Sequence, residues 1–226
     1  MAGPSRVTPA YDVVLLDLDG TIIHSEPGVH ISVQYALERG FGIVPTQAQL
    51  EEFMGPPLAE VLPRVFGLSD AVDEQRFFEL YCERYFHDAE YEFDLYPGMG
   101  DLVRDLAESD CSVVLATAKP QESAERILDR AGLIKHFAFV AGSASDGSRQ
   151  DKAEVLEHAF ASIAADGRTH RVVMVGDRAL DVQAARAHGV EAIAVTWGYA
   201  EEGELESAGA THLAGDVAQL RSVLLG

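Results

Sequence analysis

The hydrophobic positions of this chain repeat in two ways, and the two patterns alternate along most of its length. Short runs of consecutive apolar residues, most of them rich in β-branched side chains, predict buried strands. These runs are Val13–Leu18, Ser112–Ala118, Phe137–Gly142, Arg171–Gly176 and Glu191–Thr196. Between them, Gln121–Ala131 and Leu180–His188 have the spacing of amphipathic helices, and each is followed by a glycine, a common helix terminator. Strands that are apolar throughout and alternate with helices predict an α/β fold: a Rossmann-like parallel sheet with helices on both faces.

One long segment interrupts this alternation. From about Val29 to Glu92 the pattern is helical and contains no convincing strand, and Thr46 with Gln49 has the spacing of a helix capping box. Two apolar stripes at helical spacing predict a small core within this segment. They consist of Val29, Val33, Ala36 and Leu37, and of Phe77, Phe78, Tyr81 and Tyr85. We therefore predict an all-helical cap domain at residues 28–92, inserted into a core formed by residues 1–27 and 93–226.

Composition narrows the possible partners. The chain has 226 residues, 47% of them hydrophobic, which is enough for one sizeable core and a small second domain. Its net charge of −20 disfavours nucleic-acid and anionic-membrane partners. No run approaches the ~20 apolar residues of a membrane-spanning helix, and the N-terminus lacks the apolar stretch of a secretory signal. We expect a cytoplasmic protein, monomeric or homodimeric, in which Cys82 and Cys111 are buried free thiols.

Polar residues with chemical potential gather where the predicted strands end. In a parallel α/β sheet, ligands bind beyond the carboxyl ends of the strands, so these residues are expected to lie together. They are Asp17 and Asp19 at the first strand, Thr117 at the second, Lys152 after the third, and Asp177 and Asp181 after the fourth. Carboxylates, a hydroxyl and an ammonium are the groups that a metal-assisted phosphoryl-transfer site requires.

The spacing of the first two carboxylates has a physical reason. Residues i and i+2 of a strand point to the same face, so Asp17 and Asp19 are placed to converge on one ligand. Adjacent carboxylates repel, and a divalent cation removes that repulsion; hard oxygen ligands suit Mg²⁺. Gly20 then allows a sharp turn, across which Thr21 is expected to bond back. The spacing alone does not say which of the two carboxylates attacks.

The motifs DLDGT, a Thr at the end of the next strand, a downstream Lys and GDRALD occur in the order found in the haloacid dehalogenase superfamily. The resemblance covers nearly the whole chain, and four motifs in order at strand ends are specific. The helical insert resembles the C1 type of cap in that superfamily. Within it, HSEPG and FMGPPL are similar to the phosphoglycolate-phosphatase and nucleotidase-like members.

The resemblance implies distinct roles for the first two carboxylates. Asp17 would be the nucleophile that forms an aspartyl-phosphate, and Asp19 would protonate the leaving oxygen and then activate water. Dehalogenases of the superfamily lack the second acid and the metal, because halide needs no leaving-group acid. Asp19 therefore favours chemistry at phosphorus.

The resemblance also implies a metal site and a phosphate site. Mg²⁺ would be held by the first carboxylate, the backbone carbonyl of Asp19 and Asp177, with Asp181 acting directly or through water. Thr117 and the amide of Ala118 would bind phosphate oxygens, and Lys152 would neutralise charge on the nucleophile and the transferring group.

Several of these residues also have a structural alternative. Asp177 could cap the helix that begins near Ala179, and Asp181 lies one turn further on, where a capping role is also reasonable. The chain has only three lysines. One of them, Lys119, either faces the phosphate or lies in a surface loop, whereas Arg178 is expected to be structural or exposed.

The predicted cap contains four arginines, no lysine and twelve acids between Val29 and Glu92, so it would serve a highly anionic substrate poorly. A small phosphomonoester with one further polar or carboxylate group fits better, such as phosphoglycolate or a nucleoside monophosphate. Gly55–Pro57 would form a rigid loop able to enter the site. Arg64 is a candidate for gripping the distal group of the substrate, or else an exposed helix arginine.

Two other functions share the core motifs. A phosphomutase of the β-phosphoglucomutase kind has the same motifs and differs in how its cap admits water. A phospho-accepting switch such as a response-regulator receiver also uses carboxylates, a Thr, a Lys and Mg²⁺. A receiver is much shorter, however, lacks a helical cap and has no need of an acid two residues beyond the phosphoacceptor, so the phosphatase is the favoured hypothesis.

Overall fold

The computed structural model describes residues 9–54, 58–146, 148–163 and 170–226. The chain divides into two compact units. The first, here called the α/β unit, comprises the described parts of Met1–His24 and Leu95–Gly226. The second, the helical unit, is Ser25–Asp94. Each unit has its own architecture and is described separately.

The α/β unit contains a six-stranded parallel sheet, as predicted. In spatial order its strands are β5 (Phe139–Ser143), β4 (Ser112–Pro120), β1 (Val13–Leu16), β6 (Val172–Gly176), β7 (Glu191–Val195) and β8 (His212–Ala214). The first five correspond to the five predicted strands. The edge strand β8 was not predicted, because two of its three residues are exposed and it has no apolar run. Two short strands, β2 (Ile23–His24) and β3 (Asp94–Leu95), form a separate two-stranded sheet.

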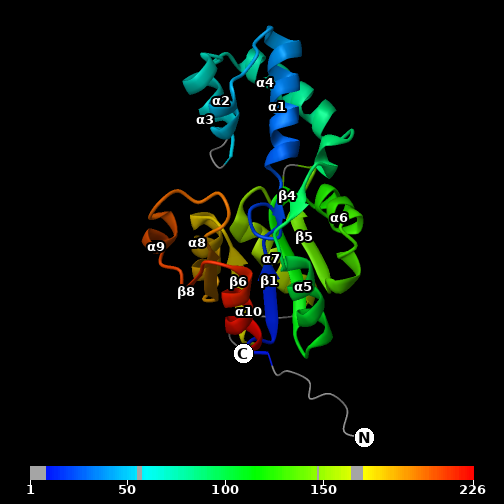
Figure 1. Cartoon of the computed structure of the whole chain (residues 1–226), viewed down its shortest axis with the longest axis vertical. Helices are drawn as coiled ribbons and strands as arrows, with labels where there is room; N and C mark the ends of the chain where they lie inside the picture. Colours follow the sequence, from blue (N-terminus) through cyan, green and yellow to red (C-terminus); the bar gives the residue numbers. More distant parts are fainter. Residues whose placement is uncertain (1–8, 55–57, 147, 164–169) are drawn as a thin grey trace, which may run out of the picture. The chain divides into compact units, whose positions relative to one another are not determined.

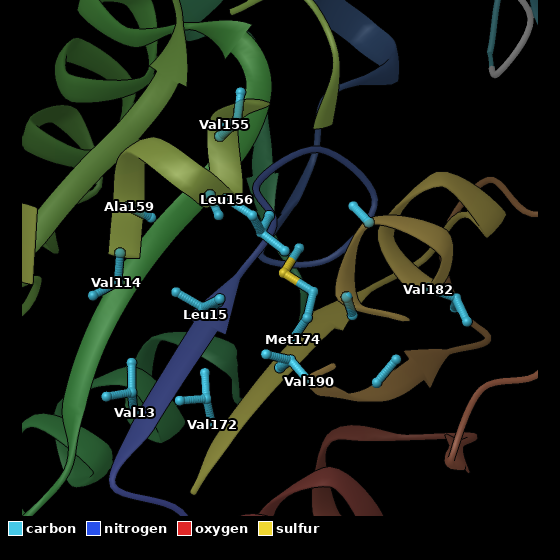
Figure 2. Close-up of a cluster of buried hydrophobic side chains, with 14 of the residues drawn as sticks. Val13, Leu15, Val114, Val155, Leu156, Ala159, Val172, Met174, Val182 and Val190 are labelled. Carbon is cyan, nitrogen blue, oxygen red and sulfur yellow. The ribbon is translucent and has the colours of Figure 1, made fainter. Parts of the chain in front are cut away.

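Helices cover both faces of the sheet (Figure 1). One set is α7 (Lys152–Ile163), α8 (Ala179–Ala187) and α9 (Glu204–Ala208). These helices pack on one face through a buried cluster that includes Leu15, Met174 and Leu156 (Figure 2). The right-handed crossovers of a parallel sheet place α5 (Met99–Glu108) and α6 (Gln121–Arg130) on the opposite face. The last helix, α10 (Val217–Leu225), follows the final strand and packs against α5.

Strand β1 is central and brings the functional segments together. It pairs in parallel with β4 on one side and with β6 on the other, and Leu16 lies opposite both Leu115 and Val175. The next residue, Asp17, donates its backbone N–H to the carbonyl of Val175 at 2.9 Å. Asp17 therefore emerges between the ends of its two neighbours, and the register of β4 shifts just beyond this point, between Ala116 and Pro120.

The helical unit has a small core of its own. Its helices are α1 (Glu26–Phe41), α2 (Gln47–Glu51), α3 (Leu58–Val61) with the π-helical turn η1 (Leu62–Phe66), α4 (Ala71–Tyr85) and the 3-10 turn η2 (Ala89–Tyr91). The predicted capping box of Thr46 and Gln49 is present. Phe77 is fully buried in the core, but the prediction for Phe78 was wrong, because its side chain is 56% exposed. Adjacent residues of a helix point about 100° apart, so only one of the two phenylalanines faces inward.

The two cysteines are both free, Cys111 buried and Cys82 half-buried. Burial raises the pKa of the Cys111 thiol to about 11, which makes it a poor nucleophile at neutral pH. Across the described ranges, the structure contains no helix with the length and apolar character needed to cross a membrane.

Candidate active site

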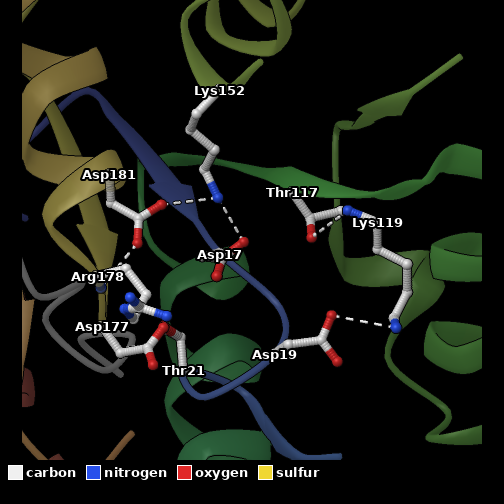
Figure 3. Close-up of polar contacts among 9 residues, drawn as sticks. All are labelled: Asp17, Asp19, Thr21, Thr117, Lys119, Lys152, Asp177, Arg178 and Asp181. Atoms are coloured by element: carbon white, nitrogen blue, oxygen red, sulfur yellow. Dashed lines mark hydrogen bonds and ion pairs between the residues drawn. The ribbon is translucent and has the colours of Figure 1, made fainter. Parts of the chain in front are cut away.

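A buried ion-pair network lies at the carboxyl end of β1. Asp17 follows this strand directly, and Lys152 is the first residue of α7. The Lys152 Nζ lies 2.5 Å from Asp17 Oδ1 and 2.7 Å from the Oδ1 of Asp181, which is on α8 (Figure 3). All three side chains are at most 10% exposed. The sequence therefore brings together residues from three separate segments, as the strand-end argument predicted.

A third carboxylate, that of Asp177, completes a compact acidic group. One oxygen each of Asp17, Asp177 and Asp181 lies within 4.8 Å of the other two. Burial, followed by the charges of the other two carboxylates, raises the pKa of Asp177 to about 8. Burial also raises the pKa of Asp17 to about 6, against the attraction of Lys152. For Lys152, burial lowers the pKa, but the attraction of Asp17 and Asp181 outweighs it, so the pKa is raised overall.

These groups fit a hard divalent cation. Three buried carboxylates share a single ammonium, so the cluster holds an excess of negative charge in surroundings that solvate it poorly. The raised pKa values of Asp17 and Asp177 agree with this excess of buried negative charge. All the converging side-chain ligands are oxygens, which Mg²⁺ prefers to nitrogen or sulfur.

Asp177 is held by the loop after β7 and does not cap α8. The backbone N–H of Tyr199 donates to Asp177 Oδ2 at 2.7 Å. Thr21 Oγ1 donates to Asp177 Oδ1 at 3.4 Å, so the Thr21 hydroxyl connects the DLDGT segment to the GDRALD segment. The residue that precedes α8 as N-cap is Arg178. The capping alternative for Asp177 is therefore wrong.

Two glycines make room for the Asp177 carboxylate. Gly20 has φ +76°, which favours glycine, and a Cβ built on it would lie 2.1 Å from Asp177 Oδ2. A Cβ on Gly198 would lie 2.3 Å from the same oxygen and 2.5 Å from the Gly20 carbonyl oxygen. Gly20 was predicted from the sequence to allow a sharp turn, and Gly198 was not predicted, although a glycine soon after a predicted strand was a usable signal.

Replacing Gly198 by alanine is expected to weaken divalent-cation binding by about 10–100-fold, the usual effect of disturbing a group that orients a metal ligand. The added methyl group would have to displace the Asp177 carboxylate. Mg²⁺ titration of the melting temperature measures the change. Gly100→Ala in α5 is the matched control, since its Cβ would meet its nearest neighbour at an ordinary 3.4 Å. Unchanged Mg²⁺ affinity in Gly198→Ala would show that Asp177 does not hold the cation.

Asp19 lies apart from the three converging carboxylates. Its Oδ2 is 3.2 Å from Lys119 Nζ, and the Lys119 side chain is only 10% exposed. The surface-loop alternative for Lys119 is therefore wrong: the lysine belongs to the site (Figure 3). Nearby, Thr117 is buried and its Oγ1 accepts the backbone N–H of Lys119 at 3.2 Å, whereas Ala118 is exposed.

Asp181 has the capping role considered for it from sequence, and its part as a metal ligand stays a prediction. Its Oδ2 accepts the backbone N–H of Arg178 at 3.1 Å, which caps the start of α8, while its Oδ1 contacts Lys152. The Arg178 side chain pairs with Glu204 of α9 at 2.9 Å and therefore links two helices, as the structural interpretation predicted.

The substrate-binding candidate Arg64 lies in the helical unit, on the turn η1. Its side chain is 53% exposed and pairs with Glu52 at 2.7 Å. These contacts are those of an exposed helix arginine, and a part in substrate binding stays a prediction. The predicted Gly55–Pro57 loop lies outside the described residues.

Comparison with known proteins agrees with this geometry. The family model of haloacid dehalogenase-like hydrolases matches residues 14–195. The chain is 37% identical to tyrosine-protein kinase PtkA of Mycobacterium tuberculosis over 83% of its own length, but spans only 62% of that relative. It is 36% identical to a 5'-nucleotidase of Pseudomonas aeruginosa, over 95% of this chain and 96% of the relative.

A solved structure from Clostridium acetobutylicum, described as a predicted phosphatase, has the same fold. It superimposes with a TM-score of 0.82 at 30% identity, covering 94% of this chain and 97% of the other. The sheet order, the strand-end acids and the match over most of the chain lead to one assignment. The chain belongs to the haloacid dehalogenase-like hydrolase family.

Proposed function

We propose that this enzyme is a Mg²⁺-dependent phosphomonoester hydrolase that acts on a small phosphorylated metabolite through an aspartyl-phosphate. The observation that carries the proposal is the buried Asp17, paired with Lys152 beside two further carboxylates. The 5'-nucleotidase name of a relative that matches over nearly its full length supports the nucleoside monophosphate class. The resemblance of HSEPG and FMGPPL supports both the phosphoglycolate and the nucleotidase-like classes.

In the proposed reaction Asp17 is the nucleophile and Asp19 is the group that transfers protons. An oxygen of Asp17 attacks phosphorus, and the bond from phosphorus to the leaving oxygen breaks as Asp19 gives that oxygen a proton. Asp19, now ionised, then takes a proton from the water that attacks the aspartyl-phosphate. The bond between phosphorus and the Asp17 oxygen breaks, which releases inorganic phosphate and restores the Asp17 carboxylate.

The surrounding groups position and neutralise the phosphoryl group. Lys152 is fixed between two carboxylates and supplies a positive charge beside the attacking oxygen. The Thr117 hydroxyl and the Ala118 amide would bind phosphoryl oxygens. Asp17, Asp177, Asp181 and the Asp19 backbone carbonyl would hold Mg²⁺, which when bound neutralises charge on the nucleophile and the phosphoryl oxygens.

We extend the proposal to the helical unit, as a cap that selects the substrate. Its place in the chain supports this, since the unit is inserted directly after the segment that carries Asp17 and Asp19. Its excess of acids over arginines favours a substrate with few charges beyond the phosphate.

The test is phosphate release from a panel of phosphomonoesters, with Mg²⁺ and with EDTA. The panel comprises phosphoglycolate, the nucleoside 5'-monophosphates, glycerol phosphate and p-nitrophenyl phosphate. We expect release that requires Mg²⁺ and is retained by Asp101→Asn, a control in an exposed ion pair on α5. Undiminished release in EDTA would contradict the metal requirement. No release, combined with phosphate transfer from ATP to tyrosine or from a sugar bisphosphate, would favour a kinase or a mutase instead.

A further inference from the structure

We propose that Lys119 is a positioning residue that orients the Asp19 carboxylate so that Oδ1 is the atom that gives and takes the proton. The inference rests on the proposed function, because it assigns a task within that reaction. It concerns one contact, the ion pair between Lys119 Nζ and Asp19 Oδ2 at 3.2 Å.

The two oxygens of Asp19 are in different situations. Oδ2 is held by Lys119, whereas Oδ1 is buried and makes no hydrogen bond to any residue that the structure describes. A buried oxygen without a hydrogen bond is costly, and such atoms are few in native structures. Oδ1 is therefore available to the leaving oxygen and the attacking water, and Lys119 fixes the rotation of the carboxylate that presents it.

The two site lysines have different partners and therefore different tasks. Lys152 lies between Asp17 and Asp181, on the side of the converging carboxylates. Lys119 contacts the one site carboxylate that is not part of that group. Figure 3 shows the two ammonium groups on opposite sides of the Asp17–Asp19 segment. Lys119 thus supports the proton-transfer group, and Lys152 supports the nucleophile.

The local backbone holds Lys119 in place. The register of β4 shifts between Ala116 and Pro120, and within this irregular stretch Thr117 Oγ1 accepts the Lys119 backbone N–H. The lysine stem is almost completely buried, so its ammonium has little freedom to leave Asp19. A bulge beside a functional site commonly re-aims a side chain in this way.

The test compares two leaving groups in Lys119→Met. An alkyl ester such as glycerol phosphate needs a proton on its leaving oxygen, whereas p-nitrophenyl phosphate leaves as a stabilised phenolate and needs little help. We expect kcat/KM for the alkyl ester to fall about tenfold more than for the aryl ester, a part of what general acid catalysis supplies. Lys119→Arg, which keeps the charge, should recover part of this difference.

The comparison remains informative if Lys119→Met folds incompletely, because both esters are measured on the same preparation and the folded fraction cancels in their ratio. Lys135→Met is the matched control, since it removes the third lysine, an exposed one, and should leave the ratio unchanged. Equal losses for both esters, or no loss for either, would overturn the inference while the proposed function stands. Absence of hydrolysis by the parent protein would overturn the proposed function itself.

Discussion

Replacing Asp17 by asparagine is expected to reduce phosphomonoester hydrolysis by roughly 10⁴-fold or more, the scale of loss when a covalent nucleophile is removed. The amide is nearly the same size as the carboxylate but does not attack phosphorus to give an acyl-phosphate. Phosphate release from the best ester of the panel measures the effect. A smaller loss, below about tenfold, would show that Asp17 is not the nucleophile.

The same variant is expected to be at least as stable as the parent protein when divalent cations are removed. Burial holds the folded-state pKa of Asp17 at about 6, above the ordinary 3.8. The unfolded chain therefore releases this proton first, and the contribution of Asp17 to stability falls as pH rises from about 4 to about 6. Asparagine does not ionise, so this loss is absent at pH 7. A lower melting temperature in EDTA would show instead that the pair with Lys152 outweighs the crowding of carboxylates.

Replacing Lys152 by methionine is expected to have the opposite effect and to lower the free energy of unfolding by about 3–5 kcal/mol in EDTA. The lysine is 8% exposed and contacts two buried carboxylates, at 2.5 and 2.7 Å. Methionine fills the space of its stem but leaves Asp17 and Asp181 without their shared cation. Hydrolysis should be lost as well, because the charge beside the nucleophile is gone.

The effect of Mg²⁺ separates a charge effect from a packing effect in this variant. If the lost stability comes from unpaired carboxylates, a divalent cation bound by the same groups should restore part of it. Urea unfolding of the parent protein and Lys152→Met, each with EDTA and with Mg²⁺, provides the comparison, and Lys135→Met controls for removal of a positive charge. Parent-like stability of Lys152→Met in EDTA would mean that the network adds little to folding.

Much of the α/β unit could be predicted because runs of consecutive apolar residues mark its buried strands. Each of the five predicted strands contains a buried apolar run, and the residues at their ends met at one edge, as parallel topology requires. β8 could not be found, since His212 and Leu213 are exposed and its pairing with β7 is a tertiary effect. In the helical unit, a choice such as Phe77 over Phe78 depends on which face of α4 packs, and residue type does not reveal that.

The part of the site that consists of acidic and basic side chains could mostly be predicted from the sequence. Asp17, Lys152, Asp177 and Asp181 were found because acids and a rare lysine at strand ends are conspicuous. The Tyr199 contribution was missed because it comes from a backbone N–H, a group that every residue except proline carries. Lys119 could not be placed because its side chain could equally have turned to solvent. The irregular end of β4 directs it inward, and that irregularity is not visible in the apolar pattern.

The central position of β1 has a consequence for the order in which the protein is made. This strand leaves the ribosome before its partner β6 and the acids that follow β6, with the helical unit, β4, β5 and α7 between them. A nascent chain released as far as α7 carries Asp17 and Lys152 without Asp177 and Asp181, two of the three converging carboxylates. Long-range pairings of this kind form late in folding. The growing polypeptide therefore acquires the complete set of converging carboxylates only after the helical unit and α7 have been synthesised.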